Sequence, residues 1–190
     1  MSAEVILPRR AHAQPVPHLA SVGDCGACAL GGALGLAVPE VYARLDHDPA
    51  KGPIGWYEMQ AALRRLGGEG LVDRALEDAP IWPHAQPAGS CEWGLTSWWQ
   101  QGPWWAYVCT AIDAGLYGLA KVRHDRAGPL SAGGDHWVLL CGYRGGRYGT
   151  RELLVSCSAR APQGTWVDLA TFARDLGGFN TLFTRPAQGR

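Results

Sequence analysis

The chain has 190 residues, the length of one ordinary domain with a single core. Lys plus Arg and Asp plus Glu both number 17, so the net charge is zero. This balance argues against a nucleic-acid partner and against binding to a charged membrane surface. Hydrophobic residues make up 47% and charged residues 18%, which predicts a globular chain rather than a disordered one.

The N-terminal segment and the cysteine usage indicate where the protein works. Residues 1–17 form a proline-rich arm without the pattern of a secretory signal, and residues 18–186 form the predicted single domain. A run of about 18 apolar residues, which a membrane span needs, does not occur. The six cysteines are spread along the chain and are typical of reduced thiols. We therefore expect a cytoplasmic protein, with export by a route that needs no N-terminal signal left open, and the oligomeric state does not follow from the sequence.

Helical patterns dominate the first part of the domain. Asp24 is a suitable N-cap for a helix from Cys25 to about Leu36, and the glycines inside it predict close packing against another backbone. Pro39 is placed to open a short helix that ends near Leu45. The apolar spacing of residues 56–66 predicts a third helix, and all three helices should pack together.

Strand patterns dominate the second part. Pro103 is predicted to start a helix that Gly115 ends, followed by a strand over residues 116–122. Residues 135–144 and 151–158 then predict an antiparallel hairpin around a glycine-rich turn. The remaining predicted elements are a strand at Trp166-Val167, a helix capped by Asp168 that runs through Leu176 and ends at Gly177, and a last strand over residues 180–184. The predicted class is α+β.

A cysteine and a histidine, far apart in the chain, carry the strongest chemical signal. Cys25 should lie in the first turn of its helix, where the positive end of the helix dipole favours a thiolate. A nucleophilic thiol also needs a base, and His136 opens an apolar strand that would fix its ring. The other five histidines lie in the arm or in loops, where a solvated side chain is the ordinary outcome: His12, His18, His47, His84 and His124.

This order, a cysteine on an N-terminal helix followed by a histidine that opens a strand, resembles the papain-like superfamily. Within it the chain is similar to the bacterial C39-like peptidases, over residues 16–184, through five short motifs: Asp24-Cys25-Gly26, Ala29-Leu30, Gly35-Leu36, His136-Trp137-Val138 and Gly142-Tyr143. The resemblance implies a papain-like fold whose nucleophile helix packs against an antiparallel sheet. It also implies a cysteine peptidase, an amidase or an acyltransferase, which acts on a peptide, protein or amide substrate without a metal or cofactor.

The resemblance leaves the nucleophile open between two cysteines, and the chain departs from the family at two places. Cys28 is an alternative nucleophile, because Cys25-Gly26-Ala27-Cys28 also resembles the CGSC motif of papain, in which the second cysteine attacks. The glutamine that usually precedes the nucleophile is missing, so Gln14 in the arm is the nearest oxyanion candidate. Ser156 and Ser158 stand where an Asp or Asn normally orients the histidine ring.

Two readings from other functional classes stay open. A catalytically inactive domain of the same fold could bind a peptide or protein partner through a tryptophan-rich face, and the same tryptophans could instead line a substrate cleft or fill the core: Trp98, Trp99, Trp104 and Trp105. The Cys-x-x-Cys spacing also occurs in thiol-disulfide oxidoreductases, although no buried strand pattern precedes it here. No spacing typical of zinc ligands is present.

Overall fold

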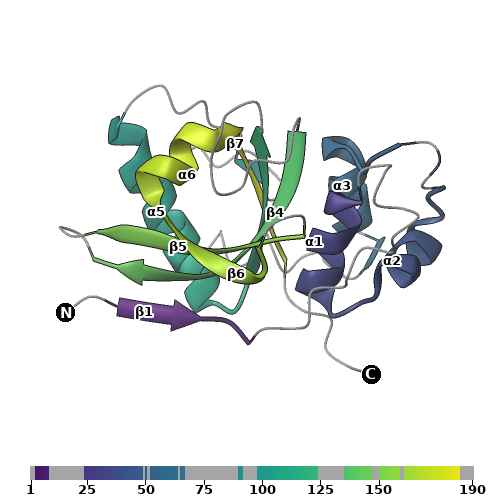
Figure 1. The fold of residues 1–190 in the computed structure, drawn as a ribbon, viewed down its shortest axis with the longest axis horizontal. Helices are drawn as coiled ribbons and strands as arrows, with labels where there is room; N and C mark the ends of the chain where they lie inside the picture. Colours follow the sequence, from purple (N-terminus) through teal and green to yellow (C-terminus); the bar gives the residue numbers. More distant parts are fainter. Residues whose placement is uncertain are drawn as a thin grey trace.

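The computed structural model describes residues 3–8, 24–48, 50, 52–63, 65–66, 90–91, 98–123, 135–146, 150–158 and 161–184. In chain order its elements are β1 (Ala3–Ile6), α1 (Cys25–Leu34), α2 (Val38–Leu45), α3 (Trp56–Leu63), β2 (Ser90–Cys91), α5 (Trp98–Asp113), β3 (Tyr117–Arg123), β4 (Asp135–Gly145), β5 (Arg151–Cys157), β6 (Ala161–Asp168), α6 (Leu169–Asp175) and β7 (Leu176–Thr184). The protein is α+β: its N-terminal helices pack against a C-terminal antiparallel sheet, as predicted. Figure 1 shows α1, α2 and α3 gathered on one side of this sheet.

The sheet runs in the order β2-β7-β3-β4-β5-β6, and neighbouring strands in it are antiparallel. The predicted hairpin is confirmed: Leu139 of β4 pairs with Ser156 of β5, and Gly145 pairs with Arg151 near the turn. Gly145 has a φ of 127°, a conformation that favours glycine, as the chain leaves β4. β4 is therefore a central strand, flanked by β3 on one edge and β5 on the other.

Sequence reasoning missed β1, which lies within the predicted arm. Ala3–Ile6 pairs antiparallel with β4, from Gly142 to Gly145. β3 pairs with β4 from Asp135 to Leu140, so β1 continues the line of β3 along the same edge of β4. The backbone N–H of Leu7 also donates to the carbonyl of Cys141 at 2.8 Å. These residues therefore satisfy backbone groups of β4 beyond the end of β3.

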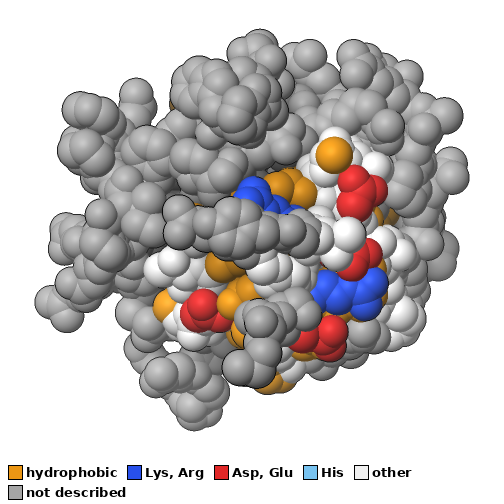
Figure 2. Space-filling model, turned by 90° about the vertical axis from the view of Figure 1, so that its left-hand side faces the viewer, with side chains coloured by type: hydrophobic (Ala, Val, Ile, Leu, Met, Phe, Trp, Pro, Cys, Tyr) orange, Lys and Arg blue, Asp and Glu red, His pale blue; other side chains and the backbone are white. Residues whose placement is uncertain are grey.

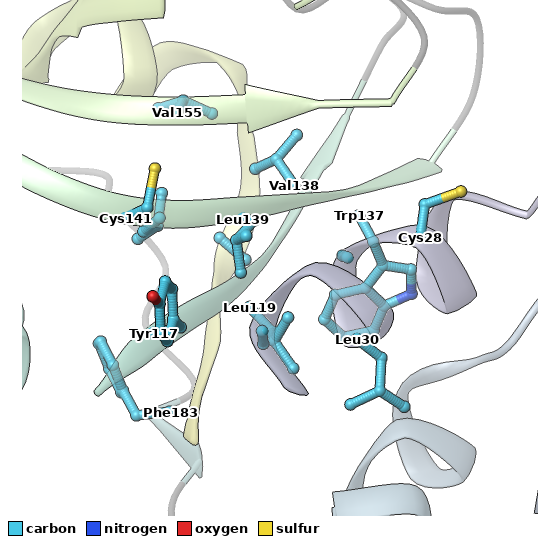
Figure 3. Close-up of a cluster of buried hydrophobic side chains, with 14 of the residues drawn as sticks. Cys28, Leu30, Tyr117, Leu119, Trp137, Val138, Leu139, Cys141, Val155 and Phe183 are labelled. Atoms are coloured by element: carbon cyan, nitrogen blue, oxygen red, sulfur yellow. The ribbon is translucent and has the colours of Figure 1, made fainter. Parts of the chain in front are cut away.

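α1 is buried along almost its whole length because its small residues allow it to pack closely. A Cβ placed on Gly26 would lie 3.0 Å from Ile54 Cβ and 3.2 Å from Trp137 Cδ1, so only glycine fits without a shift of its neighbours. Figure 3 shows Trp137 beside Cys28 and Leu30 of this helix. The indole of Trp137 also donates from Nε1 to the carbonyl of Ile54 at 2.9 Å, which ties the segment before α3 to β4.

The helix boundaries differ from the sequence predictions at two places. α5 begins at Trp98, so Pro103 lies inside the helix instead of starting it. Proline costs one backbone hydrogen bond there, and the burial of Trp105, Val108 and Ile112 from the same helix offsets that loss. α6 starts after Asp168, whose carboxylate accepts from the Thr171 N–H at 2.9 Å as predicted, but it gives way directly to β7 at Leu176.

The largest fully buried side chains come from both layers, which places the core between the helices and the sheet: Phe172, Phe183, Leu30, Ile54, Met59, Ile112, Leu116, Leu119 and Leu140. Within the described residues, no single helix is long and apolar enough to cross a membrane; α1 and α2 pass that test only as a pair, bent by 97°.

An ion pair and ring contacts stabilise the β4–β5 hairpin near its turn, which we call the turn end. Arg144 donates to Glu152 on the neighbouring strand from Nε at 2.6 Å and from Nη2 at 3.0 Å, and its guanidinium lies 4.4 Å from the ring centre of Trp166. The hydroxyl of Tyr143 donates to Asp113 at 2.8 Å. Figure 2 shows described basic and acidic side chains next to one another on one face of the molecule.

Candidate functional site

Cys25 is the first residue of α1, as the sequence predicted. Asp24 precedes the helix, but its carboxylate turns away from the first turn and accepts the hydroxyl of Tyr42 at 2.8 Å. The carbonyl of Asp24 takes the first helical hydrogen bond, from the Cys28 N–H at 2.8 Å. Cys25 is half-buried and packs against the core, whereas the rest of the first turn is fully enclosed. Cys25 is therefore the residue of this turn that solvent reaches.

His136 lies at the start of β4, next to the end of β5. The imidazole is 6% exposed, and its Nε2 lies 3.2 Å from the sulfur of Cys157, the last residue of β5. Cys157 itself is 0% exposed. The ring is thus held inside the protein, with one of its two nitrogens against a thiol. Which of the two groups donates depends on the tautomer of the ring.

The Cys25 thiol adjoins this pair. The backbone N–H of Trp137, the residue that follows His136, hydrogen-bonds the Cys25 sulfur, and Cys157 lies near enough that a charge on it would disfavour ionisation of Cys25. The starts of α1 and β4 therefore bring the Cys25 thiol to the backbone of the residue that follows His136, and the end of β5 places Cys157 against the His136 ring. We call these three residues the thiol–imidazole cluster.

Burial raises the pKa of the Cys25 thiol above its ordinary value. The backbone N–H groups of Trp137 and Gly26 act in the opposite direction, but they do not outweigh burial, and the charge of Cys157 raises the pKa further. The sequence-based expectation that the helix start favours a thiolate is therefore wrong for the resting site, because loss of hydration is the larger effect. Cys25 rests as a neutral thiol, and a base is needed to ionise it.

Cys28 faces a different environment one turn further along α1. It is 0% exposed, and burial together with the charge of Asp24 raises its pKa to about 12, although a hydrogen bond from Ser158 lowers it. The same buried carboxylate raises the pKa of the Tyr42 hydroxyl, after burial as the main cause. Cys28 therefore stays protonated and enclosed near neutral pH.

Several predicted site residues lie outside the described residues or away from the cluster. Gln14 is outside them, as are the side chains of Trp98, Trp99 and Trp104. Trp105 is 7% exposed and packs edge-on against Tyr143, with ring centres 5.8 Å apart, near the turn end of the hairpin. Ser156 is 5% exposed on β5, and Ser158 follows the strand and reaches Cys28.

Sequence reasoning missed Cys157, which lies between the two candidate serines Ser156 and Ser158. The observed hairpin register explains the placement of Cys157. With Leu139 opposite Ser156, continuation of the pairing sets Cys157 opposite Val138, two residues from His136 and therefore on the same face. Ser156, one residue earlier on β5, points to the opposite face of the sheet. Among the described residues, no group of three or more His, Cys, Asp or Glu side chains is arranged to hold a metal ion.

In comparisons with known proteins, neither a protein-family model nor a curated protein matched this sequence. The fold and the geometry of the thiol–imidazole cluster are therefore the basis for a functional proposal.

Proposed function

We propose that the protein is a papain-like cysteine hydrolase or acyltransferase, in which Cys25 is the nucleophile and His136 the general base. One observation carries the proposal. The half-buried Cys25 thiol at the start of α1 is hydrogen-bonded by the backbone N–H of Trp137, the residue that follows the buried His136. A nucleophile and a base held by two rigid elements are what acyl transfer through a thioester requires. The resemblance to C39-like peptidases supports the same roles.

The chemistry follows from the two side chains. The sulfur of Cys25 attacks a carbonyl carbon while its proton moves to the imidazole of His136, and the carbonyl π electrons shift to oxygen. Collapse of this intermediate breaks the bond to the leaving amine, which takes the proton from the imidazolium. Water or a second amine then attacks the thioester, gives its proton to His136, and releases Cys25 as a thiol. The substrate class is a peptide, protein or amide.

Exposure and pKa favour Cys25 over the other two thiols nearby. Cys28 and Cys157 are 0% exposed, so a substrate carbonyl cannot reach either sulfur, whereas Cys25 is half-buried. The pKa of Cys28, about 12, adds a second reason. The same burial disfavours a thiol-disulfide oxidoreductase, because in such enzymes the low-pKa thiol is partly exposed.

Because the pKa of Cys25 is raised, its thiol proton should move to His136 during the attack on the substrate and not before it. A neutral resting thiol does not form a standing ion pair with His136, so the proton is transferred as the substrate is attacked. Reactivity at neutral pH must then depend on the imidazole, since the thiol alone ionises only above its ordinary range. This dependence is directly measurable.

The test is residue-resolved alkylation. The wild type, Cys25→Ala, Cys28→Ala and His136→Ala are treated with limiting iodoacetamide between about pH 4 and pH 9, and labelled peptides are quantified by mass spectrometry. We expect Cys25 to label faster than Cys28 and Cys157 in the wild type near neutral pH, because His136 takes its proton as the sulfur attacks the reagent. His136→Ala should move that labelling above about pH 8.5, whereas Cys28→Ala should leave it unchanged.

The opposite result has a defined meaning. If Cys25 labels like an ordinary or buried thiol in both the wild type and His136→Ala, the catalytic proposal is wrong. The inactive partner-binding domain would then take its place.

A further inference from the structure

We propose that Cys157 is the positioning residue that orients the His136 ring. Its sulfur accepts a hydrogen bond from Nε2–H of His136. The lone pair of the ring is then on Nδ1, where it can take the proton of Cys25. This inference rests on the proposed function. It assigns to a thiol the task for which the family uses an Asp or Asn, a residue type that this stretch of β5 lacks.

The contact itself is specific. Nε2 of His136 and Sγ of Cys157 are 3.2 Å apart, within hydrogen-bonding range for sulfur, and both side chains are buried, at 6% and 0% exposure. A buried nitrogen that loses water needs a partner from the protein. The two residues lie on neighbouring antiparallel strands, whose pairing fixes the ring against the sulfur.

The tautomer decides whether this contact helps or blocks the base. A neutral imidazole has one N–H and one lone pair. If the thiol donated to Nε2, the N–H would lie on Nδ1, and the ring nitrogen not held by Cys157 could not take a proton. If the sulfur accepts from Nε2–H, the lone pair lies on Nδ1, which can then act as the base. The proposed role of Cys157 therefore requires sulfur to be the acceptor, and the dependence of Cys25 on His136 is tested separately.

The proton balance of the step is simple. The Cys25 proton moves to Nδ1, and the resulting imidazolium keeps its Nε2–H on the Cys157 sulfur, so no proton leaves Cys157. Among the described titratable groups, His136 from β4 contacts Cys157, and Cys25 from α1 interacts with it. Because a thiol is a weak acceptor, this site should orient its histidine less firmly than a carboxylate would.

The first experiment reads the tautomer. The ¹⁵N spectrum of histidine-labelled protein, with the His136 signals identified by their loss in His136→Ala, distinguishes Nε2–H from Nδ1–H directly. We expect the Nε2–H form in the wild type and in Cys157→Ser, whose hydroxyl is also an acceptor. Cys157→Ala should give a mixture of both forms.

The second experiment measures the consequence for Cys25. Cys157→Ala should lower the rate of Cys25 alkylation at pH 7 by roughly tenfold or more, and Cys157→Ser should restore it to near wild type. Cys157→Asp should move Cys25 labelling to lower pH, because a carboxylate stabilises the imidazolium. Cys141→Ala is the matched control: it removes another buried thiol of the sheet, whose sulfur donates to the Leu154 carbonyl at 3.4 Å.

The outcomes separate this inference from the proposed function. An Nδ1–H tautomer in the wild type, or wild-type alkylation in a folded Cys157→Ala, overturns the role of Cys157 while His136 still controls Cys25. Wild-type alkylation in His136→Ala instead overturns the function itself. If Cys157→Ala does not fold, as judged by circular dichroism, the wild-type tautomer and Cys157→Ser still decide.

Discussion

At the turn end of the β4–β5 hairpin, Arg144 meets the carboxylate of Glu152 at 2.6 Å and 3.0 Å, and each charge has an opposite partner. At the open end, the buried ring of His136 lies 3.2 Å from the sulfur of Cys157, and the Cys25 thiol is hydrogen-bonded by the backbone of the next residue, Trp137. The same two strands therefore carry a strongly complementary pair at one end and a weakly complementary cluster at the other.

The two ends of the hairpin therefore differ in what we expect of their side chains, which is stability at the turn end and reactivity at the open end. Opposite charges on adjacent strands strengthen a sheet, and they hold the pKa of Glu152 below its usual range. A buried imidazole against a thiol gains little stability from that contact, because sulfur is a weak hydrogen-bonding partner and burial removes water from both groups. Local rules of stability are typically broken at functional sites, so the open end is where we expect reactivity.

The largest expected effect is on reactivity at the open end. His136→Ala should reduce any Cys25-dependent acyl transfer by about 10³-fold or more, because the thiol loses its base. His136→Gln, which keeps most of the buried volume, should leave the melting temperature close to that of the wild type, since a thiol is a weak hydrogen-bonding partner for the ring. Thermal unfolding and alkylation, measured on the same sample, check both parts. A large loss of stability would show that the cluster is structural, and would break the comparison.

The converse experiment removes a ring at the turn end. Trp105 is 7% exposed and packs against Tyr143, so Trp105→Ala should lower the free energy of unfolding by about 3–5 kcal/mol. Urea unfolding measures this loss. Cys25 alkylation per folded molecule should not change, because Trp105 lies near the far end of the hairpin. A change in alkylation would show that the two ends are coupled.

Much of the fold could be predicted because the elements concerned have local signals. The hairpin and the Asp168 cap follow from alternation and capping, and both were predicted correctly. β1 could not be predicted, because its stability comes from pairing with Gly142–Gly145 far along the chain. The start of α5 was wrong for a similar reason: burial of its apolar face outweighs the local penalty of Pro103.

The candidate site divides in the same way. Cys25 and His136 could be proposed from motifs at the starts of their elements. The pKa of Cys25 could not be inferred, because the helix dipole is visible in the sequence whereas burial by the sheet is not. Cys157 required the register of two strands, and a one-residue change in register would put Ser156 or Ser158 on the face of His136 instead.

A pH experiment tests a property that the two ends share. Burial raises the pKa of Cys28 near the cluster, and of Cys109 on α5, to about 12. Both thiols have a higher pKa in the folded state than in the unfolded state, so their stabilisation is complete below about pH 8.5 and is lost as pH rises toward 12.

We therefore expect Cys28 alone to lower stability by up to about 1.4 kcal/mol per pH unit in the alkaline range. Urea unfolding at neutral and alkaline pH measures this slope. Cys28→Ala should flatten it, and an unchanged slope in that variant would contradict the assignment.

The smallest expected effect concerns a single hydrogen bond at the turn end. Tyr143 is 6% exposed and donates to Asp113 at 2.8 Å, so Tyr143→Phe removes the bond and keeps the ring. The carboxylate of Asp113 stays accessible to water, which limits the loss to about 1 kcal/mol, or about 2–4 °C in melting temperature. Tyr57→Phe is the control, because that hydroxyl belongs to a side chain that is 81% exposed and should cost nothing measurable. Cys25 alkylation should be the same in both variants. If Tyr143→Phe changed Cys25 alkylation, loss of this hydrogen bond would affect the His136 imidazole through β4. The two ends of the hairpin would then be coupled.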